Sequence, residues 1–422
     1  MPTDSAAYSK DFIPSEFLGL SRNLWKLAIM LGVAQFSIGL WKWEFGIFLE
    51  YGILFEPWQM GITFSSGMLA TLLGAFISGT IADFLGRRWT IVVFLLPIAV
   101  GLLIMSYMPI WPLVPLQWAL IWMGMSSVRT MSAAIPADEV AANAGKNPAK
   151  KFMMVMMPLW FIDGLSPLLG TFLLDLGFQS SNLHMIAGFG AILAIIVAAT
   201  TIKESLKSEV SEKARAGPVV SFRQLGRDYW KIVLGMIPYL FFYTTAIQYL
   251  GNLCVNEWGI DRITYGLTWS VFSLTSAAFM YFMSSLADRN LKAALITAVA
   301  GNGLVFITFG IGNGVELVFF LNFIWALPFI VWLGAERSLL AASVSEEVKG
   351  RAFGTYTFIM NFIGIFTMSF GSILWEITGS LRFVWTLSGV GMLLTIFLLI
   401  PILRSIRVDA GEAGPLLPPF ES

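Results

Sequence analysis

The chain has 422 residues, of which 57% are hydrophobic and 12% are charged, with 26 basic and 26 acidic side chains. Soluble proteins carry roughly 25% charged residues, so the composition excludes an ordinary soluble domain. The net charge of zero gives no broad attraction to nucleic acid, and a single cysteine, Cys254, excludes an intramolecular disulfide.

Long apolar runs recur along the whole chain. A bilayer core about 30 Å thick needs roughly 20 apolar residues in a helix. By that measure the sequence predicts twelve spans, at about 24–54, 60–81, 89–108, 111–135, 152–177, 183–202, 229–253, 264–286, 293–312, 315–340, 352–376 and 383–403. We therefore expect an all-α, multi-pass integral membrane protein, located in the cell membrane.

Basic residues are unevenly distributed among the segments that connect these spans. With the N-terminus placed in the cytoplasm, 21 Lys and Arg residues fall in cytoplasmic segments, and only Arg262 and Arg382 fall on the opposite side. Because basic connecting segments stay in the cytoplasm, this bias predicts that both termini are cytoplasmic.

The longest polar break lies near the middle of the chain. It predicts a cytoplasmic linker over 203–228, which separates a six-helix bundle at 1–202 from a second at 229–403. The linker can be read as an amphipathic helix on the membrane surface or as a passive tether. Residues 404–422, which contain Gly-Pro and Pro-Pro pairs, are expected to form a disordered cytoplasmic tail.

An internal repeat supports this division. The segment 129–140, Arg-Thr-Met-Ser-Ala-Ala-Ile-Pro-Ala-Asp-Glu-Val, lines up with 337–348, Arg-Ser-Leu-Leu-Ala-Ala-Ser-Val-Ser-Glu-Glu-Val, at an offset of 208 residues. The segment 284–292 echoes the polar gap at 79–88 at an offset of 205. Nearly equal offsets indicate a 6+6 duplication with pseudo-symmetric halves, as is common in transporters.

The polar gap between the second and third spans reads Gly-Thr-Ile-Ala-Asp-Phe-Leu-Gly-Arg-Arg. This resembles the signature of the major facilitator superfamily, in which Gly is followed by Asp and then by Gly-Arg and a second basic residue. The resemblance implies a cytoplasmic gate closed by charged side chains. The expected gate residues are Gly79, Asp83, Gly86, Arg87, Arg88, Arg129, Glu139, Asp288, Arg337, Glu347 and Arg351. The alternative is that these charges only anchor the chain in its orientation.

Some segments resemble the sugar-porter branch of that superfamily. Trp43-Glu44-Phe45-Gly46 is similar to its Tyr-Asp-x-Gly, and 347–351 is similar to its Glu-x-x-Gly-Arg loop. The paired glutamines of the seventh span are absent, and the Pro-Glu-Ser-Pro motif after the sixth span is reduced to Glu204-Ser205. The likeness therefore covers the scaffold and not the sugar pocket.

Among the charged side chains within predicted spans of the first half, Asp163 lies closest to the centre of its span, followed by Lys42 and Glu44. A charge at the bilayer centre costs at least roughly 2.5–3.5 kcal/mol, so each needs a partner or a function. We expect Asp163 and Glu44 to include the proton-coupling carboxylate, and Lys42 to contact Asp163 or an anionic group of the substrate. The alternative is a permanent Lys42–Asp163 pair with Glu44 turned outward.

In the second half we expect no comparable central acid. Its interior offers neutral polar and aromatic side chains, which suit a small polar solute with an apolar side. With Lys42, the expected substrate-binding residues are Tyr239, Tyr243, Gln248, Asn322, Trp325 and Asn361.

Neither a phosphate-binding Gly-Lys-Ser/Thr loop nor a His/Cys metal cluster is present in the sequence, so we expect no enzyme activity, metal or cofactor. The sequence predicts a monomeric secondary active transporter that moves a small organic solute, sugar-like or carboxylate, by alternating access with protons. A proton-coupled exporter of amphipathic compounds, a uniporter, and a receptor or scaffold of the same fold are the alternatives. The expected partners are the substrate, protons and the lipid bilayer, and not nucleic acid.

Overall fold

A computed structural model describes the backbone of residues 20–142, 148–204, 225–344 and 349–406. Within these ranges, the structure does not describe the side chains of residues 80, 83, 133, 134, 136–154, 281, 284–286, 288 and 349–351. The secondary structure of the described residues is built from helices. Most of the predicted linker and tail, 203–228 and 404–422, falls outside the described residues.

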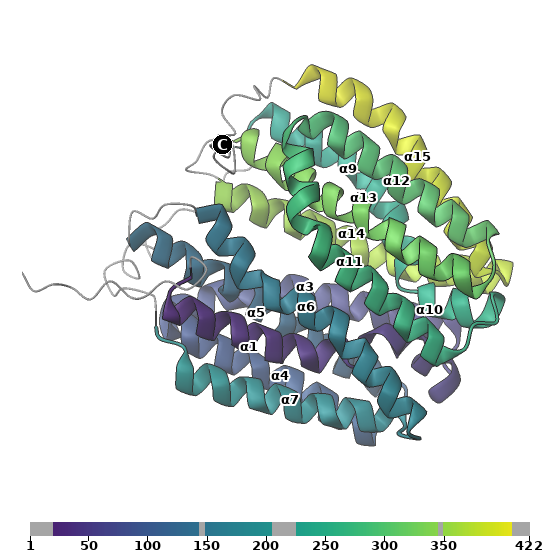
Figure 1. The fold of residues 1–422 in the computed structure, drawn as a ribbon, viewed down its shortest axis with the longest axis horizontal. Coiled ribbons are helices and arrows are strands. Elements are labelled where there is room, and N and C mark those ends of the chain that lie inside the picture. Colours follow the sequence, from purple (N-terminus) through teal and green to yellow (C-terminus); the bar gives the residue numbers. More distant parts are fainter. Residues whose placement is uncertain (1–19, 143–147, 205–224, 345–348, 407–422) are drawn as a thin grey trace, which may run out of the picture.

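The long helices form two bundles that lie against each other (Figure 1). The first half of the chain contains α1 (Arg22–Gly39), η1 (Lys42–Glu44), α2 (Phe45–Ile47), η2 (Phe48–Gly52), α3 (Pro57–Leu85), α4 (Arg87–Tyr107), α5 (Leu113–Ala142), α6 (Pro148–Asp175) and α7 (Ser180–Thr201). The second contains α9 (Arg227–Ile247), α10 (Leu250–Asn252), η4 (Leu253–Glu257), α11 (Arg262–Asp288), α12 (Leu291–Ile311), α13 (Val315–Ala342), α14 (Lys349–Thr378) and α15 (Leu381–Ser405).

The order of short and long helices is repeated between the halves. The α2 and η2 segments begin at residues 45 and 48, and α10 and η4 begin at 250 and 253, which is an offset of 205 in both cases. The same offset carries the start of α3, at 57, onto the start of α11, at 262. The structure therefore repeats its elements at the spacing found in the sequence.

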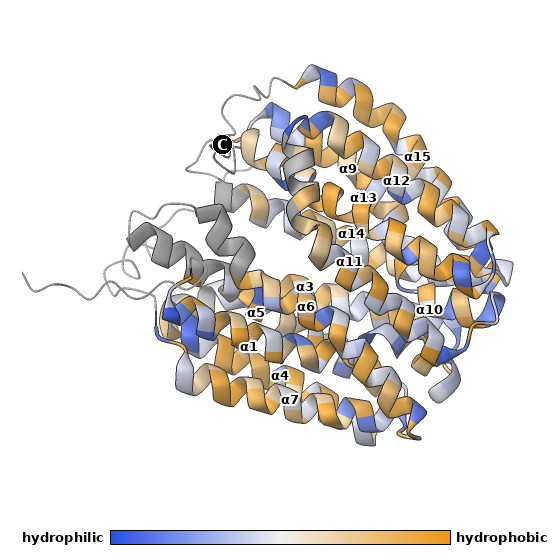
Figure 2. Ribbon diagram, in the orientation of Figure 1, coloured by the Kyte–Doolittle hydropathy of each residue, from blue (hydrophilic) through white to orange (hydrophobic). Residues whose placement is uncertain are grey.

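Ten helices of the described chain are long and apolar enough to cross a membrane. Figure 2 shows hydrophobic residues along the lengths of the helices and hydrophilic residues gathered at the ends of the bundles. The chain is thus a multi-pass integral membrane protein, and the count of twelve spans stays a prediction. The two long helices outside the ten are α5 and α11, whose stretches around Arg129 and Thr268–Ser276 carry Ser, Thr and charged residues.

The turn between α3 and α4 depends on Gly86. Its φ of 82° is one that side chains other than glycine rarely adopt, and an added Cβ would collide with the Glu204 carboxylate. That carboxylate accepts hydrogen bonds from the backbone N–H groups of Arg87, at 2.9 Å, and Arg88, at 3.1 Å. Because a helix start exposes unpaired N–H groups, Glu204 caps α4 and ties the signature loop to the end of α7.

Candidate functional site

A buried carboxylate joins the two halves. Asp163 lies on α6, near the middle of the helix as predicted, and is only 7% exposed. One of its oxygens accepts a hydrogen bond from Gln35 Nε2 on α1, at 2.5 Å, and the other accepts from Ser273 Oγ on α11, at 3.0 Å. Asp163 is therefore bonded to both bundles at once.

Two cationic groups lie beside this carboxylate. Lys42 Nζ is 5.6 Å from the centre of the Trp122 ring and 5.8 Å from that of Trp269, and the Arg129 guanidinium carbon is 5.9 Å from Trp122. Asp163 attracts both cations, which repel each other. Within the described chain, neither cation has a hydrogen bond or a salt bridge.

The position of Arg129 differs from the sequence prediction. We expected it near the cytoplasmic end of a span that stops at 135. Instead α5 extends from 113 to 142, so its midpoint is (113 + 142)/2 = 127.5 and Arg129 lies close to it. The polar residues after Arg129 concealed this continuation of the helix. The carboxylates among the expected gate residues (Asp83, Glu139, Asp288 and Glu347), with which Arg129 could pair, have side chains outside the described residues.

Glu44, the other expected coupling carboxyl, has different partners from Asp163. Its side chain is fully buried and forms a salt bridge with Arg262 at the start of α11. Arg262 also donates a hydrogen bond to Ser180 at the start of α7. Lys42 and Glu44 thus point to different parts of the molecule, as their spacing of two residues on a helix predicted.

Beyond Glu44, a group of residues that we call the clamp connects the halves: Gly46, Glu50, Tyr51, Asn252 and Asn256. Glu50 accepts hydrogen bonds from the amides of Asn252 and Asn256, both at 2.7 Å. Tyr51 donates to Asn256 at 2.6 Å, and Asn252 donates to the Gly46 carbonyl at 2.9 Å. An added Cβ on Gly46 would collide with Asn252. We call this end of the molecule the closed end.

The clamp pairs corresponding positions of the repeat, because its partners are 202 to 206 residues apart. Sequence reasoning missed it, since Glu50 and Asn256 have no distinctive local pattern. The repeat offset was the one available signal, because residues at equivalent positions of two related halves meet near the axis that relates them.

Most of the expected substrate residues of the second half are packed in its core. Tyr239 is fully buried and its hydroxyl accepts a hydrogen bond from Asn302 on α12, at 2.9 Å. Asn322 donates to the Val318 carbonyl of its own helix, and Trp325 packs on Phe272 with ring centres 4.6 Å apart. Tyr243 stacks on Tyr239, and Gln248 and Asn361 are partly exposed.

The second half contains a buried acid that we did not predict, although it lies toward the C-terminal end of α13 and not at its centre. Glu336 on α13 is 3% exposed, and one of its carboxylate oxygens accepts hydrogen bonds from Trp332 Nε1, at 3.0 Å, and from the Tyr356 hydroxyl. The neighbouring Arg337 masked this residue in the sequence, because the repeat began at that arginine and the pair looked like an ordinary charged helix end.

The described gate residues do not form one cluster. Gly79 has open space around its Cα, whereas Gly86, Arg87 and Arg88 contact Glu204. The side chains of Asp83, Glu139, Asp288, Glu347 and Arg351 lie outside the described residues. The gate hypothesis therefore stays a prediction, and Glu204 is the additional residue that the structure brings to the signature loop.

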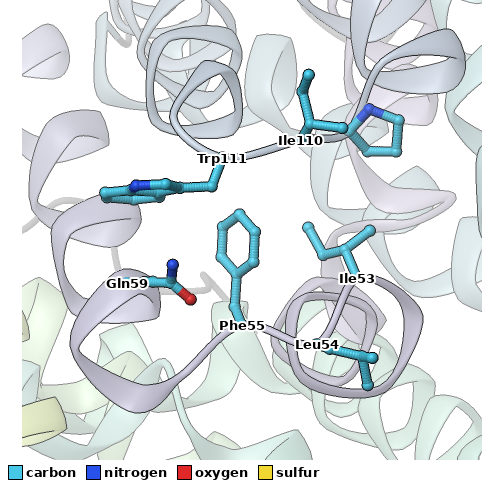
Figure 3. A pocket seen from close by; sticks show the side chains of 7 residues that line it. Ile53, Leu54, Phe55, Gln59, Ile110 and Trp111 are labelled. Carbon is cyan, nitrogen blue, oxygen red and sulfur yellow. The ribbon is translucent and has the colours of Figure 1, made fainter.

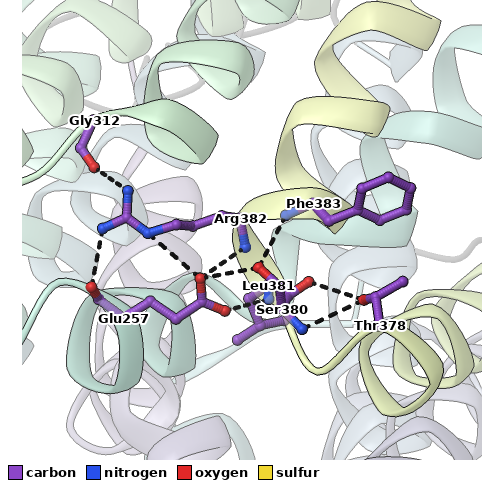
Figure 4. A network of polar contacts seen from close by, with 7 residues as sticks. All are labelled: Glu257, Gly312, Thr378, Ser380, Leu381, Arg382 and Phe383. Carbon is purple, nitrogen blue, oxygen red and sulfur yellow. Dashed lines mark hydrogen bonds and ion pairs between the residues drawn. The ribbon is translucent and has the colours of Figure 1, made fainter.

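Two other features mark the closed end. A pocket of about 450 Å³ lies within the first half, lined by Phe55, Gln59, Trp111 and neighbouring apolar side chains (Figure 3). In the second half, the Glu257 carboxylate accepts from the backbone N–H groups of Leu381 and Arg382 at the start of α15 (Figure 4). Each feature belongs to a single half and lies apart from Asp163.

No protein-family model and no curated protein matches the chain. Solved structures do match over almost its whole length. The nucleoside transporter NupG has a TM-score of 0.70 at 14% identity, and the match covers 91% of this chain and 99% of the other. A POT family transporter in complex with a thioalcohol-conjugated peptide has a TM-score of 0.74 at 13% identity, covering 94% and 99%.

A third similar structure is a bacterial homolog of the human lysosomal transporter Spinster, in an inward-facing and occupied conformation. Its TM-score is 0.70 at 13% identity, and the match covers 91% of this chain and 96% of the other. All three structures are transporters. At such low identities the similarity establishes a shared fold.

Proposed function

We propose that this chain, which has the fold of the major facilitator transporters, is a secondary active transporter that moves a small organic solute by proton-coupled symport. The observation that carries the proposal is Asp163, a buried carboxylate bonded to both halves beside two cations without salt-bridge partners in the described chain. Sites for substrate and coupling ion in transporters lie near the midplane, where the two repeats meet.

The distribution of contacts between the halves supports alternating access. Among the described residues, every hydrogen bond between the halves lies between the level of Asp163 and the closed end. Ser65 on α3 bonds Ser369 on α14 at 2.8 Å, and Asp163 bonds Ser273. From the positive-inside rule we infer that the closed end, which carries Arg262 and Arg382, faces outside. The arrangement then corresponds to a conformation that is shut to the outside, and transport requires these contacts to break.

Asp163 can link a proton to that movement. As a carboxylate it accepts charge-assisted hydrogen bonds from both halves, and such bonds are roughly twice as strong as neutral ones. Protonation removes the charge, weakens the bond to Ser273 and reduces the attraction for Lys42 and Arg129. A proton on Asp163 therefore favours separation of the halves at this level.

Glu44 is the less suitable coupling carboxyl. Its salt bridge to Arg262 crosses between the halves at the closed end, so we assign it to the lock that holds this end shut. Lys42 remains a substrate residue in the proposal, and Arg129 joins it. Of the residues expected in the second half, Gln248 and Asn361 stay available as partly exposed positions.

The test uses purified protein in liposomes that hold an internal pH dye, with sugars, small carboxylates and amino acids added outside one at a time. Wild-type protein should acidify the interior with one class of solute faster than protein-free liposomes do, because protonated small carboxylic acids also cross bilayers unaided. Asp163→Asn should abolish the acidification but retain exchange of labelled solute across the membrane. Glu376→Gln, which changes an exposed carboxyl on α14, is the control.

Acidification by Asp163→Asn at the wild-type rate would contradict the assignment of Asp163. Solute-dependent alkalinisation would favour the proton-coupled exporter, and solute exchange without proton movement in the wild type would favour a uniporter.

A further inference from the structure

We propose that the transported solute is an organic monoanion with a flat apolar part, bound by Lys42 and Arg129 through its acidic group and by Trp122 and Trp269 through its flat part. This inference rests on the proposed transport function and specifies its substrate class. It goes beyond the sequence expectation, which left a sugar-like or a carboxylate solute open.

The charges of the site favour an anionic ligand. With Lys42 and Arg129 protonated and Asp163 ionised, the site carries one positive charge in excess, because two basic side chains lie beside one carboxyl. Both oxygens of Asp163 are already bonded, to Gln35 and to Ser273, and neither cation has a salt bridge in the described chain. A charge within the membrane needs a partner. A ligand with one negative charge supplies it.

The aromatic rings beside Lys42 favour a ligand with a flat apolar part. Trp122 lies on α5 of the first half and Trp269 on α11 of the second, and the Lys42 ammonium is within 6 Å of both ring centres. An anion that contacts Lys42 is therefore placed beside two indole rings. Flat apolar groups bind well against such rings, and contact with both rings would connect the halves.

Two polar atoms at the site also lack partners among the described residues. They are the indole nitrogen Nε1 of Trp122 and the amide oxygen Oε1 of Gln35, both of which are buried. Buried polar atoms are normally hydrogen-bonded, so each has capacity for a ligand. Nε1 of Trp122 can donate to the acidic group, and Oε1 of Gln35 can accept from a hydroxyl or amide of the solute.

The same observations argue against other solutes. A neutral sugar would leave the excess positive charge without compensation, and an organic cation would be repelled by Lys42 and Arg129. A zwitterionic amino acid would need a second carboxylate for its ammonium group, but the oxygens of Asp163 are occupied. These three classes are the contrasts for the experiment.

The experiment measures binding to the purified full-length protein in detergent, by calorimetry and without any proton gradient. Binding is used because protonated aromatic acids cross bilayers unaided. The anionic probes are benzoate, phenylpropionate and indole-3-acetate. Four compounds serve as contrasts. Benzamide removes the charge, benzylamine reverses it, phenylalanine adds an ammonium group, and acetate removes the ring.

We expect the aromatic anions to bind at least about 30-fold more tightly than the neutral and cationic contrasts, as for a desolvated charge pair. Arg129→Gln and Lys42→Gln should each remove this preference, and Lys42→Arg should retain it. Trp269→Ala should reduce the advantage of benzoate over acetate. Lys203→Gln and Arg289→Gln, which change exposed cations elsewhere, should leave all affinities unchanged.

Equal binding of benzoate and benzamide, tighter binding of phenylalanine than of phenylpropionate, or no binding of any aromatic anion at millimolar concentration would overturn the inference. The probe series uses the wild type, so it decides the question even where a variant does not fold. Failure of the transport proposal is distinguishable: aromatic anions would bind but would exchange no faster than across protein-free liposomes. Exchange of a neutral solute without anion binding would overturn only the substrate class.

Discussion

The two buried carboxylates Asp163 and Glu336 differ in whether their hydrogen-bond partners lie in both halves of the protein or in one. Asp163 accepts hydrogen bonds from α1 of its own half and from α11 of the other. Glu336 accepts from Trp332 and Tyr356, which belong to α13 and α14 of the same half. Burial in the membrane is costly for both. In the proposed mechanism only Asp163 would lose a partner when the halves move, which is why we assign coupling to Asp163 and not to Glu336.

The halves differ in the same sense. The first half supplies Lys42, Arg129 and Asp163, whereas the second half contributes neutral groups such as Trp269 and Ser273 to the same site. Asn302 donates a hydrogen bond to the Tyr239 hydroxyl inside the second half. The first half therefore supplies the charges of this site, and the second half contributes neutral side chains to it.

The largest expected contrast is between matched variants of the two carboxylates. Asp163→Asn should reduce proton-coupled uptake to background, whereas Glu336→Gln should retain it within about threefold. Trp332 and Tyr356 both donate to the same carboxylate oxygen of Glu336, and the amide oxygen of glutamine can accept both hydrogen bonds in its place. Glu336→Leu should lower the thermal stability, because the hydroxyl of Tyr356 and the indole N–H of Trp332 would be left buried without an acceptor. Solute-dependent acidification in liposomes and thermal unfolding are the measurements. Loss of coupling in Glu336→Gln would place the proton site in the second half.

The next contrast concerns two arginines at the closed end. Arg262 pairs with Glu44 across the halves, whereas Arg382 pairs with Glu257 inside the second half at 3.5 Å. Arg262→Gln should favour opening of this end by about tenfold, which corresponds to roughly 1.4 kcal/mol. Arg382→Gln, the matched control, should leave the opening unchanged.

Opening can be measured from the labelling rate of a cysteine placed at Thr171, which is 2% exposed and contacts Gly266 of the other half. The variant Thr171→Cys is made together with Cys254→Ser, so that the label has one site. A maleimide that does not cross membranes should react faster in Arg262→Gln than in its parent. Equal rates would show that the salt bridge does not hold the closed end shut.

The sequence predicted features that depend on neighbouring residues better than contacts between residues far apart in the chain. The signature loop was readable because Gly86, Arg87 and Arg88 act within one turn, and Asp163 was readable because a lone acid in an apolar run is conspicuous. Arg129 was misplaced because polar residues hid the end of its helix. Glu336 was missed beside Arg337, and the clamp was missed because its pairs are about 200 residues apart. Side-chain partners across two bundles depend on packing that no local pattern records.

A third contrast tests the signature loop against a neighbouring glycine. Gly86→Ala should lower the free energy of unfolding by about 1–3 kcal/mol, because φ is 82° and the new methyl group would displace Glu204. Gly79→Ala is the control, since nothing lies within 4 Å of its added Cβ and alanine favours helix. Thermal unfolding in detergent compares the two. A destabilisation that is equal in both variants would mean that the turn at Gly86 has no special requirement.

The smallest expected effect concerns helix capping within one half. Glu257 accepts hydrogen bonds from Ser380 and from the N–H groups of Leu381 and Arg382, so its charge lies at the start of α15 (Figure 4). Glu257→Gln should lower the free energy of unfolding by about 1 kcal/mol, as expected for loss of a capping charge. Labelling at Thr171→Cys should stay unchanged, because the contact does not cross between the halves. If Glu257→Gln accelerated labelling as much as Arg262→Gln, contacts within a half would control opening as strongly as contacts between halves, and the distinction drawn from Asp163 and Glu336 would fail.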